Sequence, residues 1–313
     1  VTGSAHEWVL SEQASVLIDC GLFQGRDQGP GGAGAGNLAI DFDVSRIQAL
    51  VLTHVHIDHV GRLPWLFAAG FSGPIYCSGP SARLLPIVLE DAFRLGVSRA
   101  PAQVEQFLSL LEERLVPLPY DHWHDLDLPG GVKSEVRLQR AGHILGSAFV
   151  ECRWQGRHIT VFSGDLGNAD AVLMKDPEIV TDADVVLMEG TYGDRDHRTM
   201  DNTLEELDKA LQQASHDRGN VLIPSFAVGR TQEMLFHLGV LYKQGKVPQQ
   251  RIFLDSPMGI EVTRLYTEYM DLLDPEDLKK ISVKLGDDPK SYLPMLSLTE
   301  STEDSMAINR IKD

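Results

Sequence analysis

The sequence contains few cysteines, no long hydrophobic run and comparatively little positive charge. Its three cysteines, Cys20, Cys77 and Cys152, are far apart and odd in number, which argues against a disulfide framework or a cysteine-based zinc site. Reduced thiols of this kind favour a cytoplasmic protein. No apolar run approaches the roughly 20 residues that cross a bilayer, so no membrane partner is expected. No secretory signal is recognisable. The sequence begins at Val1 and not at Met, so whether a leader precedes Val1 is an open question.

Acidic residues outnumber basic ones, with 45 Asp and Glu against 28 Lys and Arg and a formal net charge of −17. Proteins that hold nucleic acid by broad electrostatic attraction are usually basic, so the composition argues against such a partner. Bound divalent cations and local arginines could still create a positive cleft on an acidic protein. The length of 313 residues allows two domains, and 43% apolar residues are ordinary for a globular protein.

The strongest signal is the segment Thr53-His54-Val55-His56-Ile57-Asp58-His59, which follows the apolar residues 49–52. An apolar run bounded by polar residues predicts a buried strand. The loop at the end of such a strand is where α/β proteins usually place their chemistry. The segment is therefore the first candidate for a functional site.

The spacing of its polar side chains points to metal ions. In an extended chain His54 and His56 point the same way, so they could bind one cation together. Asp58 and His59 follow where the chain turns, and could hold a second ion beside the first. Imidazole together with carboxylate suits zinc, and these ligand types are also compatible with manganese or iron.

Four more residues are candidates because of their place beside predicted strands or small residues. They are Asp19, His143, Asp165 and Glu189. Alone, Asp19 and Asp165 would more often be ordinary turn residues, and His143 a hydrogen-bonded core histidine. Small residues around His143 nevertheless allow the backbone to approach a site closely. Asp165 could bridge two cations, with one oxygen to each.

The pattern His54-x-His56-x-Asp58-His59 resembles the signature of the metallo-β-lactamase superfamily, which binds one or two metals in an αββα sandwich. Gly142 to Ala148 is similar to one branch of that superfamily. The resemblance implies that Asp19 orients the metal-bound water or a ligand. It also implies two metal sites: a first formed by His54, His56 and His143, a second formed by Asp58 and His59, and Asp165 bridging them.

Later segments resemble the β-CASP branch, whose members cut RNA or DNA. They are Glu189 with the following Thr-Tyr-Gly-Asp-Arg, residues 226–233 and residues 254–258. Glu189 and its neighbours are similar to the RNA-processing members, such as the pre-mRNA 3′-end endonuclease and its prokaryotic relatives. The resemblance implies catalytic roles for Asp19, Asp58 and Glu189, the last positioning a general-acid histidine. Arg230, at a predicted helix start, could meet a substrate phosphate, although an ordinary surface arginine is the commoner case.

The implied fold is α/β. Residues 1–193 would form the metallo-β-lactamase sandwich, and residues 194–313 an incomplete, inserted α/β β-CASP domain. In that family an opening strand precedes the turn at 1–4, and the chain returns to the sandwich with two more active-site histidines. We therefore expect both pieces to be missing, and the chain as given to be impaired as an enzyme.

Periodicity predicts the main elements. Helices are expected over 81–96, 101–115 and 202–215 and from about 230 to 244, with short strands over 220–224 and near 252–256. A second His-x-His pair, His122 and His124, has no apolar strand leading into it. We interpret that pair as part of a solvated loop.

The implied function is metal-dependent hydrolysis of RNA phosphodiester bonds by a metal-bridged hydroxide, with two zinc ions in the intact enzyme. Single-stranded RNA is the expected partner, and a homodimer is possible. The preference for RNA over DNA follows from the resemblance alone. Cleavage within the chain and cleavage from an end both stay open.

Two alternatives remain. A small-molecule metallo-hydrolase acting on a lactone, thioester or lactam would suit the acidic charge, but the insertion after Glu189 argues against it. The second alternative is a non-catalytic scaffold subunit of an RNA-processing assembly. Catalytically dead relatives lose metal ligands, whereas this sequence retains each of the ligands expected within its span.

Overall fold

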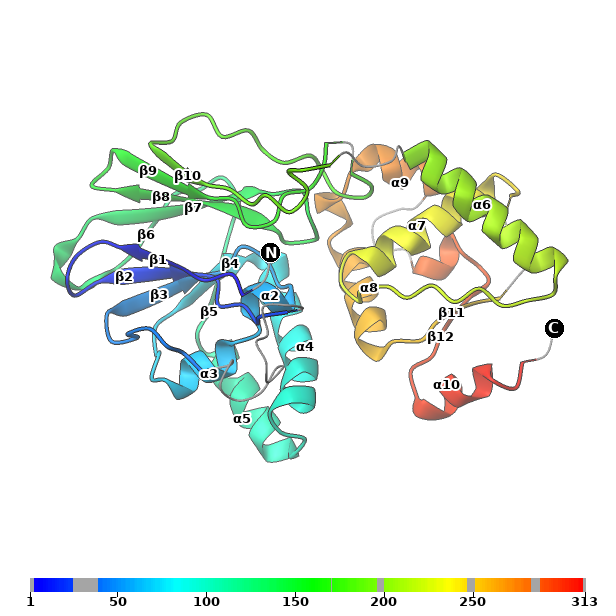
Figure 1. The fold of residues 1–313 in the computed structure, drawn as a ribbon, viewed down its shortest axis with the longest axis horizontal. Helices are drawn as coiled ribbons and strands as arrows, with labels where there is room; N and C mark the ends of the chain where they lie inside the picture. Colours follow the sequence, from blue (N-terminus) through cyan, green and yellow to red (C-terminus); the bar gives the residue numbers. More distant parts are fainter. Residues whose placement is uncertain are drawn as a thin grey trace. The chain divides into compact units, whose positions relative to one another are not determined.

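The computed structural model describes residues 3–24, 39–169, 171–195, 200–246, 251–282 and 288–311 (Figure 1). The chain forms two compact units. The first unit comprises Val1–Ala171 and Asp176–Thr191, and the second comprises Val172–Lys175 and Tyr192–Asp313. Across the described ranges, no helix is both long and apolar enough to cross a membrane.

One five-stranded sheet of the first unit, here called the first sheet, has the order β1-β2-β3-β4-β5. Its strands are β1 (His6–Val9), β2 (Ser15–Ile18), β3 (Ile47–Val51), β4 (Ile75–Ser78) and β5 (Leu115–Leu118). Strand β1, which the sequence did not predict, pairs antiparallel with β2, and the remaining pairs are parallel. Strands β2, β3 and β4 therefore end at the same edge of the sheet.

Helices accompany the first sheet: α2 (Ile57–Val60), α3 (Leu63–Ala68), α4 (Gly79–Gly96) and α5 (Pro101–Glu112). Helix α4 begins at a Ser78 cap and packs on β4, β5 and α5. The helices predicted over 81–96 and 101–115 are confirmed. Helix α5 ends earlier than expected, because Leu115 already begins β5.

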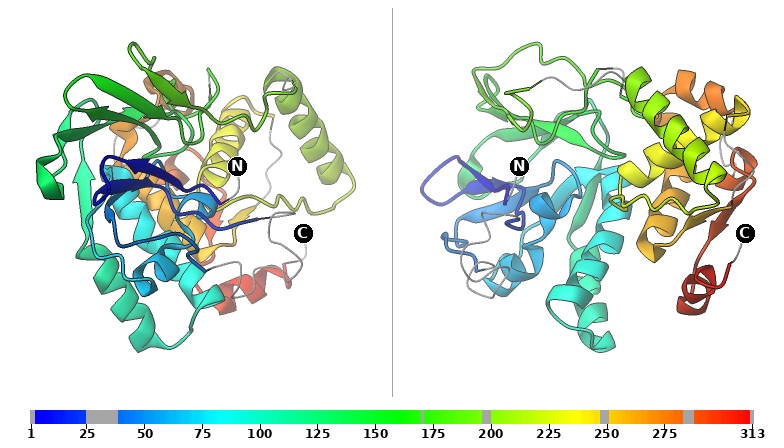
Figure 2. Two further views of the ribbon diagram at one scale, coloured as in Figure 1. Left: turned by 60° about the vertical axis from the view of Figure 1, so that its left-hand side comes forward. Right: turned by 45° about the vertical axis from the view of Figure 1, so that its right-hand side comes forward.

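The other five-stranded sheet, the second sheet, has the order β10-β9-β8-β7-β6. Its strands are β6 (His124–Asp125), β7 (Ser134–Arg140), β8 (Ala148–Trp154), β9 (His158–Phe162) and β10 (Val185–Leu187). Strand β10 runs parallel to β9, and the other pairs are antiparallel. In Figure 2 the green strands of this sheet lie over the blue strands of the first.

The two sheets share one hydrophobic core, which includes Val16 and Val51 of the first sheet with Val136, Leu138 and Val150 of the second. Along β7 buried and half-buried residues alternate, as expected for a strand with one face on the core. The predicted α/β sandwich is confirmed.

The second unit alternates helices with short strands. They are α6 (Met200–His216), α7 (Arg230–Lys243), β11 (Ile252–Leu254), α8 (Pro257–Glu268), α9 (Pro275–Ile281), β12 (Leu296–Leu298) and α10 (Thr302–Ile308). Strands β11 and β12 pair in parallel, as the alternation predicts. The segment Val172–Lys175, although it precedes β10 in the sequence, joins this unit. Leu173 is buried there, and its N–H donates to Asp277 Oδ2 at 2.8 Å.

The strand predicted over 220–224 is wrong. These residues form no strand in the described chain, and Leu222 is 90% exposed. The run Val-Leu-Ile has the composition of a strand, but a strand also needs a neighbour to receive its backbone hydrogen bonds. Among the described residues none pairs with this segment.

Candidate metal centre

The predicted site residues of the first unit follow the ends of its strands. Asp19 follows β2, the His54 to His59 segment follows β3, Asp165 follows β9 and Glu189 follows β10, while His143 lies in the loop between β7 and β8. Because β2, β3, β9 and β10 end on the same side of the sandwich, residues far apart in sequence meet there.

Two groups of side chains in this region could each hold a metal ion. The first group consists of His54, His56, His143 and Asp165, and the second group of Asp58, His59 and Asp165. In each group, one donor atom per residue lies within 4.8 Å of every other. Asp165 belongs to both groups, which is the arrangement expected of a bridging carboxylate.

The first group brings three imidazole nitrogens together. His56 Nδ1 lies 3.1 Å from His54 Nε2 and 3.1 Å from His143 Nε2. Nitrogen ligands about 2.0–2.1 Å from a tetrahedral zinc would be roughly 3.3–3.4 Å apart. Asp165 Oδ2 completes the group, at 3.9 Å from His54 Nε2 and 3.8 Å from His143 Nε2. The donor set and its spacing fit a divalent metal ion.

Burial keeps the rings of His54 and His143 in the form that binds metal. It lowers the pKa of His54 well below the ordinary value, and the neighbouring histidines lower it further. Burial, assisted by His56, lowers the pKa of His143 to about 4. Both rings are therefore neutral near pH 7, and neutral imidazole is the metal-binding form.

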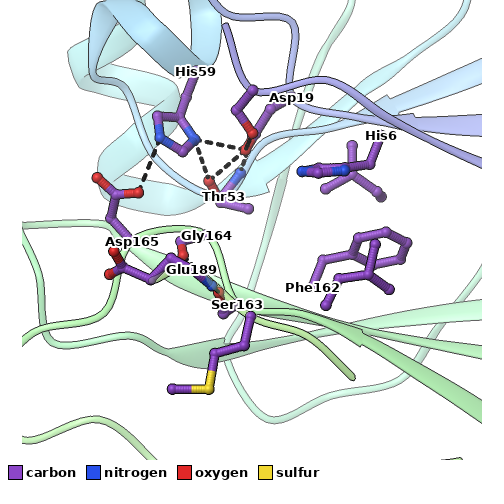
Figure 3. Close-up of a pocket in the computed structure, with 13 residues that line it drawn as sticks. His6, Asp19, Thr53, His59, Phe162, Ser163, Gly164, Asp165 and Glu189 are labelled. Atoms are coloured by element: carbon purple, nitrogen blue, oxygen red, sulfur yellow. Dashed lines mark hydrogen bonds and ion pairs between the residues drawn. The ribbon is translucent and has the colours of Figure 1, made fainter. Parts of the chain in front are cut away.

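The second group contains a histidine of the opposite character. His59 Nδ1 lies 2.7 Å from Asp19 Oδ2, and His59 Nε2 lies 3.2 Å from Asp165 Oδ1 (Figure 3). His59 Nε2 also lies 4.0 Å from Asp58 Oδ2. Burial lowers the pKa of His59, but Asp19 and Asp165 outweigh it and raise this pKa to about 10. Without metal, the ring is thus a cation held between two carboxylates.

Two buried polar atoms of the second group indicate that a ligand or an ion belongs between them. His59 Nε2 and Asp165 Oδ1 are buried, and neither has a well-formed hydrogen bond among the described residues. Buried polar atoms in native proteins almost always have partners, so such a pair calls for a ligand or an ion. A divalent cation would satisfy the imidazole and the carboxylate together.

Asp19 belongs to neither ligand group, yet it is central to their order. It is 1% exposed and adopts the left-handed backbone conformation, with φ 61°. Besides contacting His59, its carboxylate accepts hydrogen bonds from the Thr53 N–H at 2.8 Å, the Thr53 hydroxyl at 2.9 Å and the Ser4 hydroxyl at 3.2 Å. Asp19 thus holds His59 and Thr53 together, and its expected role of orienting the metal-bound water or a ligand stays a prediction.

Backbone hydrogen bonds hold Asp58 and His59 in place. The N–H groups of Cys20 and Ser4 donate to the carbonyls of His59 and Asp58, at 2.7 Å and 2.9 Å. Cys20, after β2, and Ser4, before β1, are therefore joined to the short helix α2 that carries Asp58 and His59. These hydrogen bonds fix the backbone from which the two side chains extend.

Glycines allow the ligand loops to touch. A Cβ at Gly167 would lie 1.9 Å from the carbonyl oxygen of Gly142, next to His143. Gly164 has φ +54°, and a Cβ there would lie 2.7 Å from Cβ of Thr53. The Asp165 loop thus packs directly on the backbone of the His143 loop and on the side chain of Thr53.

Serines that sequence analysis did not single out support the His143 loop. The Ser147 hydroxyl accepts from the N–H groups of His143 and Ile144, at 3.0 Å and 3.2 Å. Ser78 and Ser81, at the start of α4, both donate to the carbonyl of Gly146. The Gly146-Ser147 pair after His143 was the available signal, but its partners on α4 are 65 and 68 residues away.

Glu189 anchors the loop that carries Asp165. Its carboxylate accepts from the N–H of Leu166 at 2.7 Å and from the hydroxyl of Thr191 at 2.5 Å. A cavity of about 230 Å³ extends from His59, Asp165 and Glu189 toward His6 and Phe162, whose rings are 5.8 Å apart (Figure 3). His6, on the unpredicted β1, was not recognised as a neighbour of the site.

Some histidine and arginine candidates lie outside the two groups. His124 lies in β6, against the expectation of a loop, and His122 is exposed with Nδ1 2.8 Å from the carbonyl of Tyr120. Arg230 begins α7 in the second unit, where its guanidinium donates to Glu233 at 2.7 Å. Its side chain is 61% exposed.

Comparisons with known proteins agree with this architecture. Residues 7–217 match the Metallo-beta-lactamase superfamily, and residues 231–313 match the Beta-Casp domain. A protein named Ribonuclease TTHA0252, from Thermus thermophilus, is 40% identical over 99% of this chain and 68% of its own length. A Transcription termination factor FttA from Methanosarcina mazei is 29% identical over 88% of this chain and 43% of its own length. An RNase J-like protein from Methanocaldococcus jannaschii is 29% identical, over 86% and 59%. The chain thus spans less than two thirds of the last two relatives.

Proposed function

Because this chain belongs to the metallo-β-lactamase superfamily and carries a β-CASP domain, we propose that it acts as a metal-dependent ribonuclease on single-stranded RNA. The observation that carries the proposal is the pair of ligand groups joined by Asp165. Zinc, with one ion in each group, is the metal that imidazole and carboxylate donors suit best. Such ions, when bound, activate water and neutralise charge that develops on a phosphodiester.

The protein's own residues supply orientation around that chemistry. Asp19 holds His59 through the 2.7 Å contact at Nδ1, which leaves Nε2 directed at Asp165. Asp58 adds a carboxylate to the same group, and Glu189 fixes the Asp165 loop through the N–H of Leu166. The further role of Glu189, positioning a general-acid histidine, stays a prediction.

The expected impairment of the chain as given also stays a prediction. The first group has its four donors within the described residues, and the second has three. Metal binding by the first group should therefore be measurable on this chain, whatever its rate of RNA cleavage.

A parallel assay on one preparation tests the function. We expect single-stranded RNA to be cleaved much faster than a thioester, a lactone or a β-lactam, with activity lost on chelation and restored by added zinc. A preferred thioester would favour the small-molecule hydrolase. A zinc-loaded protein without activity on any substrate would favour the scaffold.

The phosphate contact proposed for Arg230 has its own test. Arg230→Gln should weaken RNA binding about equally for all sequences and reduce the dependence of log affinity on log salt by about 1. Arg264→Gln is a matched control, since Arg264 is also an exposed arginine paired with a glutamate. Equal salt dependence in the two variants would remove Arg230 from the RNA contacts.

Two further features stay predictions. The cytoplasmic location is supported by three cysteines that are buried and unpaired. A homodimer can be checked by sedimentation of the purified protein over a range of concentrations.

A further inference from the structure

The hydroxyl of Thr53, a residue to which the sequence assigned no role, lies between both ligand groups and Asp19. Thr53 is 1% exposed. Its Oγ1 is 2.9 Å from Asp19 Oδ2, 3.1 Å from His54 Nδ1 and 3.3 Å from His59 Nδ1. One hydroxyl therefore meets a carboxylate and the outer nitrogens of two histidines (Figure 3 draws it beside Asp19 and His59).

The protons and lone pairs of this hydroxyl limit the hydrogen bonds that it can make. It has one proton to donate and two lone pairs with which to accept. The proton goes to Asp19 Oδ2, since a carboxylate can only accept. Toward His54 the oxygen is then an acceptor, so the 3.1 Å contact is favourable only when His54 Nδ1 carries a hydrogen. A hydrogen at Nδ1 of a neutral ring leaves the lone pair on Nε2, the nitrogen in the first ligand group.

The threonine cannot easily turn away from this position. Its N–H donates to Asp19 Oδ1 at 2.8 Å, and its carbonyl accepts from the N–H of Ala148 at 2.8 Å. Gly164 packs directly against its Cβ and Oγ1. The hydroxyl is therefore fixed by three segments of the first unit at once.

We propose that Thr53 is a positioning residue that sets the tautomer of His54, keeping the hydrogen on Nδ1 and the lone pair of Nε2 available to the metal. The inference rests on the metal centre of the proposed function and is independent of the substrate. Outer partners of metal-binding histidines act in this way in general, and their loss commonly weakens metal binding 10–100-fold.

Nitrogen NMR of the metal-free protein, labelled in its histidine rings, tests the proposal directly. We expect His54 in the wild-type protein to carry its hydrogen on Nδ1. A wild-type ring with the hydrogen on Nε2 would overturn the proposal. This measurement needs no zinc, so a protein that bound no zinc would refute the proposed metal centre without deciding the tautomer.

Two variants then separate the hydroxyl from the shape of the side chain. Thr53→Val keeps the branched shape but removes the hydroxyl, and should weaken zinc binding by about 10–100-fold in competition with a chelator. Thr53→Ser keeps the hydroxyl and should bind zinc nearly as well as the wild type. Thr267→Val, in the second unit, controls for the general effect of this exchange.

Zinc affinity unchanged in a folded Thr53→Val variant would overturn the proposal. Weakened binding in Thr53→Ser equal to that in Thr53→Val would do the same, because the hydroxyl would then be irrelevant. If Thr53→Val does not fold, the wild-type tautomer and the affinity of Thr53→Ser still decide.

Discussion

The two ligand groups share Asp165 and come largely from one sequence motif, yet they differ in charge. In the first group, burial lowers the pKa of His54 and of His143, so neutral rings face one another without metal. In the second, Asp19 and Asp165 raise the pKa of His59 to about 10 against the opposing effect of burial. His54 and His143 are thus neutral, whereas the second group already contains a cation in the form of the protonated His59 ring.

Ligand type alone therefore does not define a metal site. His54 and His59 are both fully buried histidines of the same motif, and their ring centroids are only 4.0 Å apart. Their neighbours differ: His54 Nδ1 meets the Thr53 hydroxyl, whereas His59 Nδ1 meets the Asp19 carboxylate besides that hydroxyl, and Asp165 faces His59 Nε2. A carboxylate stabilises a proton on the ring as well as a metal ion, so the two compete.

Removing the residue that the groups share should have the largest effect. Asp165→Asn keeps the size of the side chain but removes the charge that faces both groups. Because it eliminates a direct ligand, we expect zinc affinity to fall by roughly 100-fold or more at both sites, beyond the usual cost of losing an outer partner. Isothermal titration measures this, and RNA cleavage should be lost with it.

Asp127→Asn, an exposed aspartate of the same unit, is the control for Asp165→Asn. It should bind zinc as the wild type does. If Asp165→Asn retained one tightly bound ion, Asp165 would serve a single group. The two ligand groups would then be independent metal sites.

Variants selective for one group should have the next largest effect. The first group offers four donors and the second three, so we expect close to one tightly held zinc per chain and a second that chelators remove first. His143→Asn should weaken binding of the tight ion by more than the roughly 10–100-fold that losing an outer partner commonly costs. Asp58→Asn should affect only the ion that is lost easily. Elemental analysis during stepwise dialysis against a chelator distinguishes the two losses.

The opposite result would assign the tight ion to the second group. If Asp58→Asn removed the tight ion while His143→Asn spared it, the protonated His59 ring would be no obstacle to metal. The three-donor group would then be the stronger site.

Each pH unit should change zinc binding less than these substitutions do, and it should do so selectively for the second group. With a pKa of about 10, the His59 ring must lose its proton for zinc to bind at Nε2. Affinity of the second group should therefore rise by about tenfold per pH unit below pH 10. His143, with a pKa of about 4, imposes no such dependence on the first group between pH 6 and 9. Zinc titrations at several pH values would show equal slopes for the two ions if the difference in protonation were absent.

The same shift has a consequence for the metal-free protein. The pKa of His59 is raised from 6.5 to about 10, so its contribution to stability is complete below about pH 6.5 and lost as the pH rises through 10. Added zinc should reverse that loss. Urea unfolding at pH 6 and pH 9, with and without zinc, measures both directions.

Much of the candidate site could be predicted because its ligands follow the ends of strands. The apolar run before Thr53 and the one before Gly164 identify two buried strands, so the polar residues after them could be placed at one edge. What could not be predicted depends on contacts across long stretches of sequence. The Thr53 hydroxyl has its partner Asp19 34 residues away, and Gly146 receives hydrogen bonds from Ser78 and Ser81.

The errors in the fold have the same origin. Residues 220–224 have the composition of a strand, but the described chain provides no partner for them. Strand β1 was missed because its four residues, His6–Val9, are defined by pairing with β2 rather than by a pattern of their own. Local sequence indicates which segments can be strands, and pairing decides which of them are.

The placement of Val172–Lys175 in the second unit bears on how the protein is made and cut. The chain passes between the units at 171/172, 175/176 and 191/192, so no single cleavage yields the two units whole. Two pieces expressed separately around residue 193 would leave Leu173 on the piece without its partner Asp277. A ribosome would release this short segment well before the helices that bury it, so the second unit can finish folding only around chain that was synthesised earlier. Exchanging the second unit between relatives would therefore require transplanting both of its segments together.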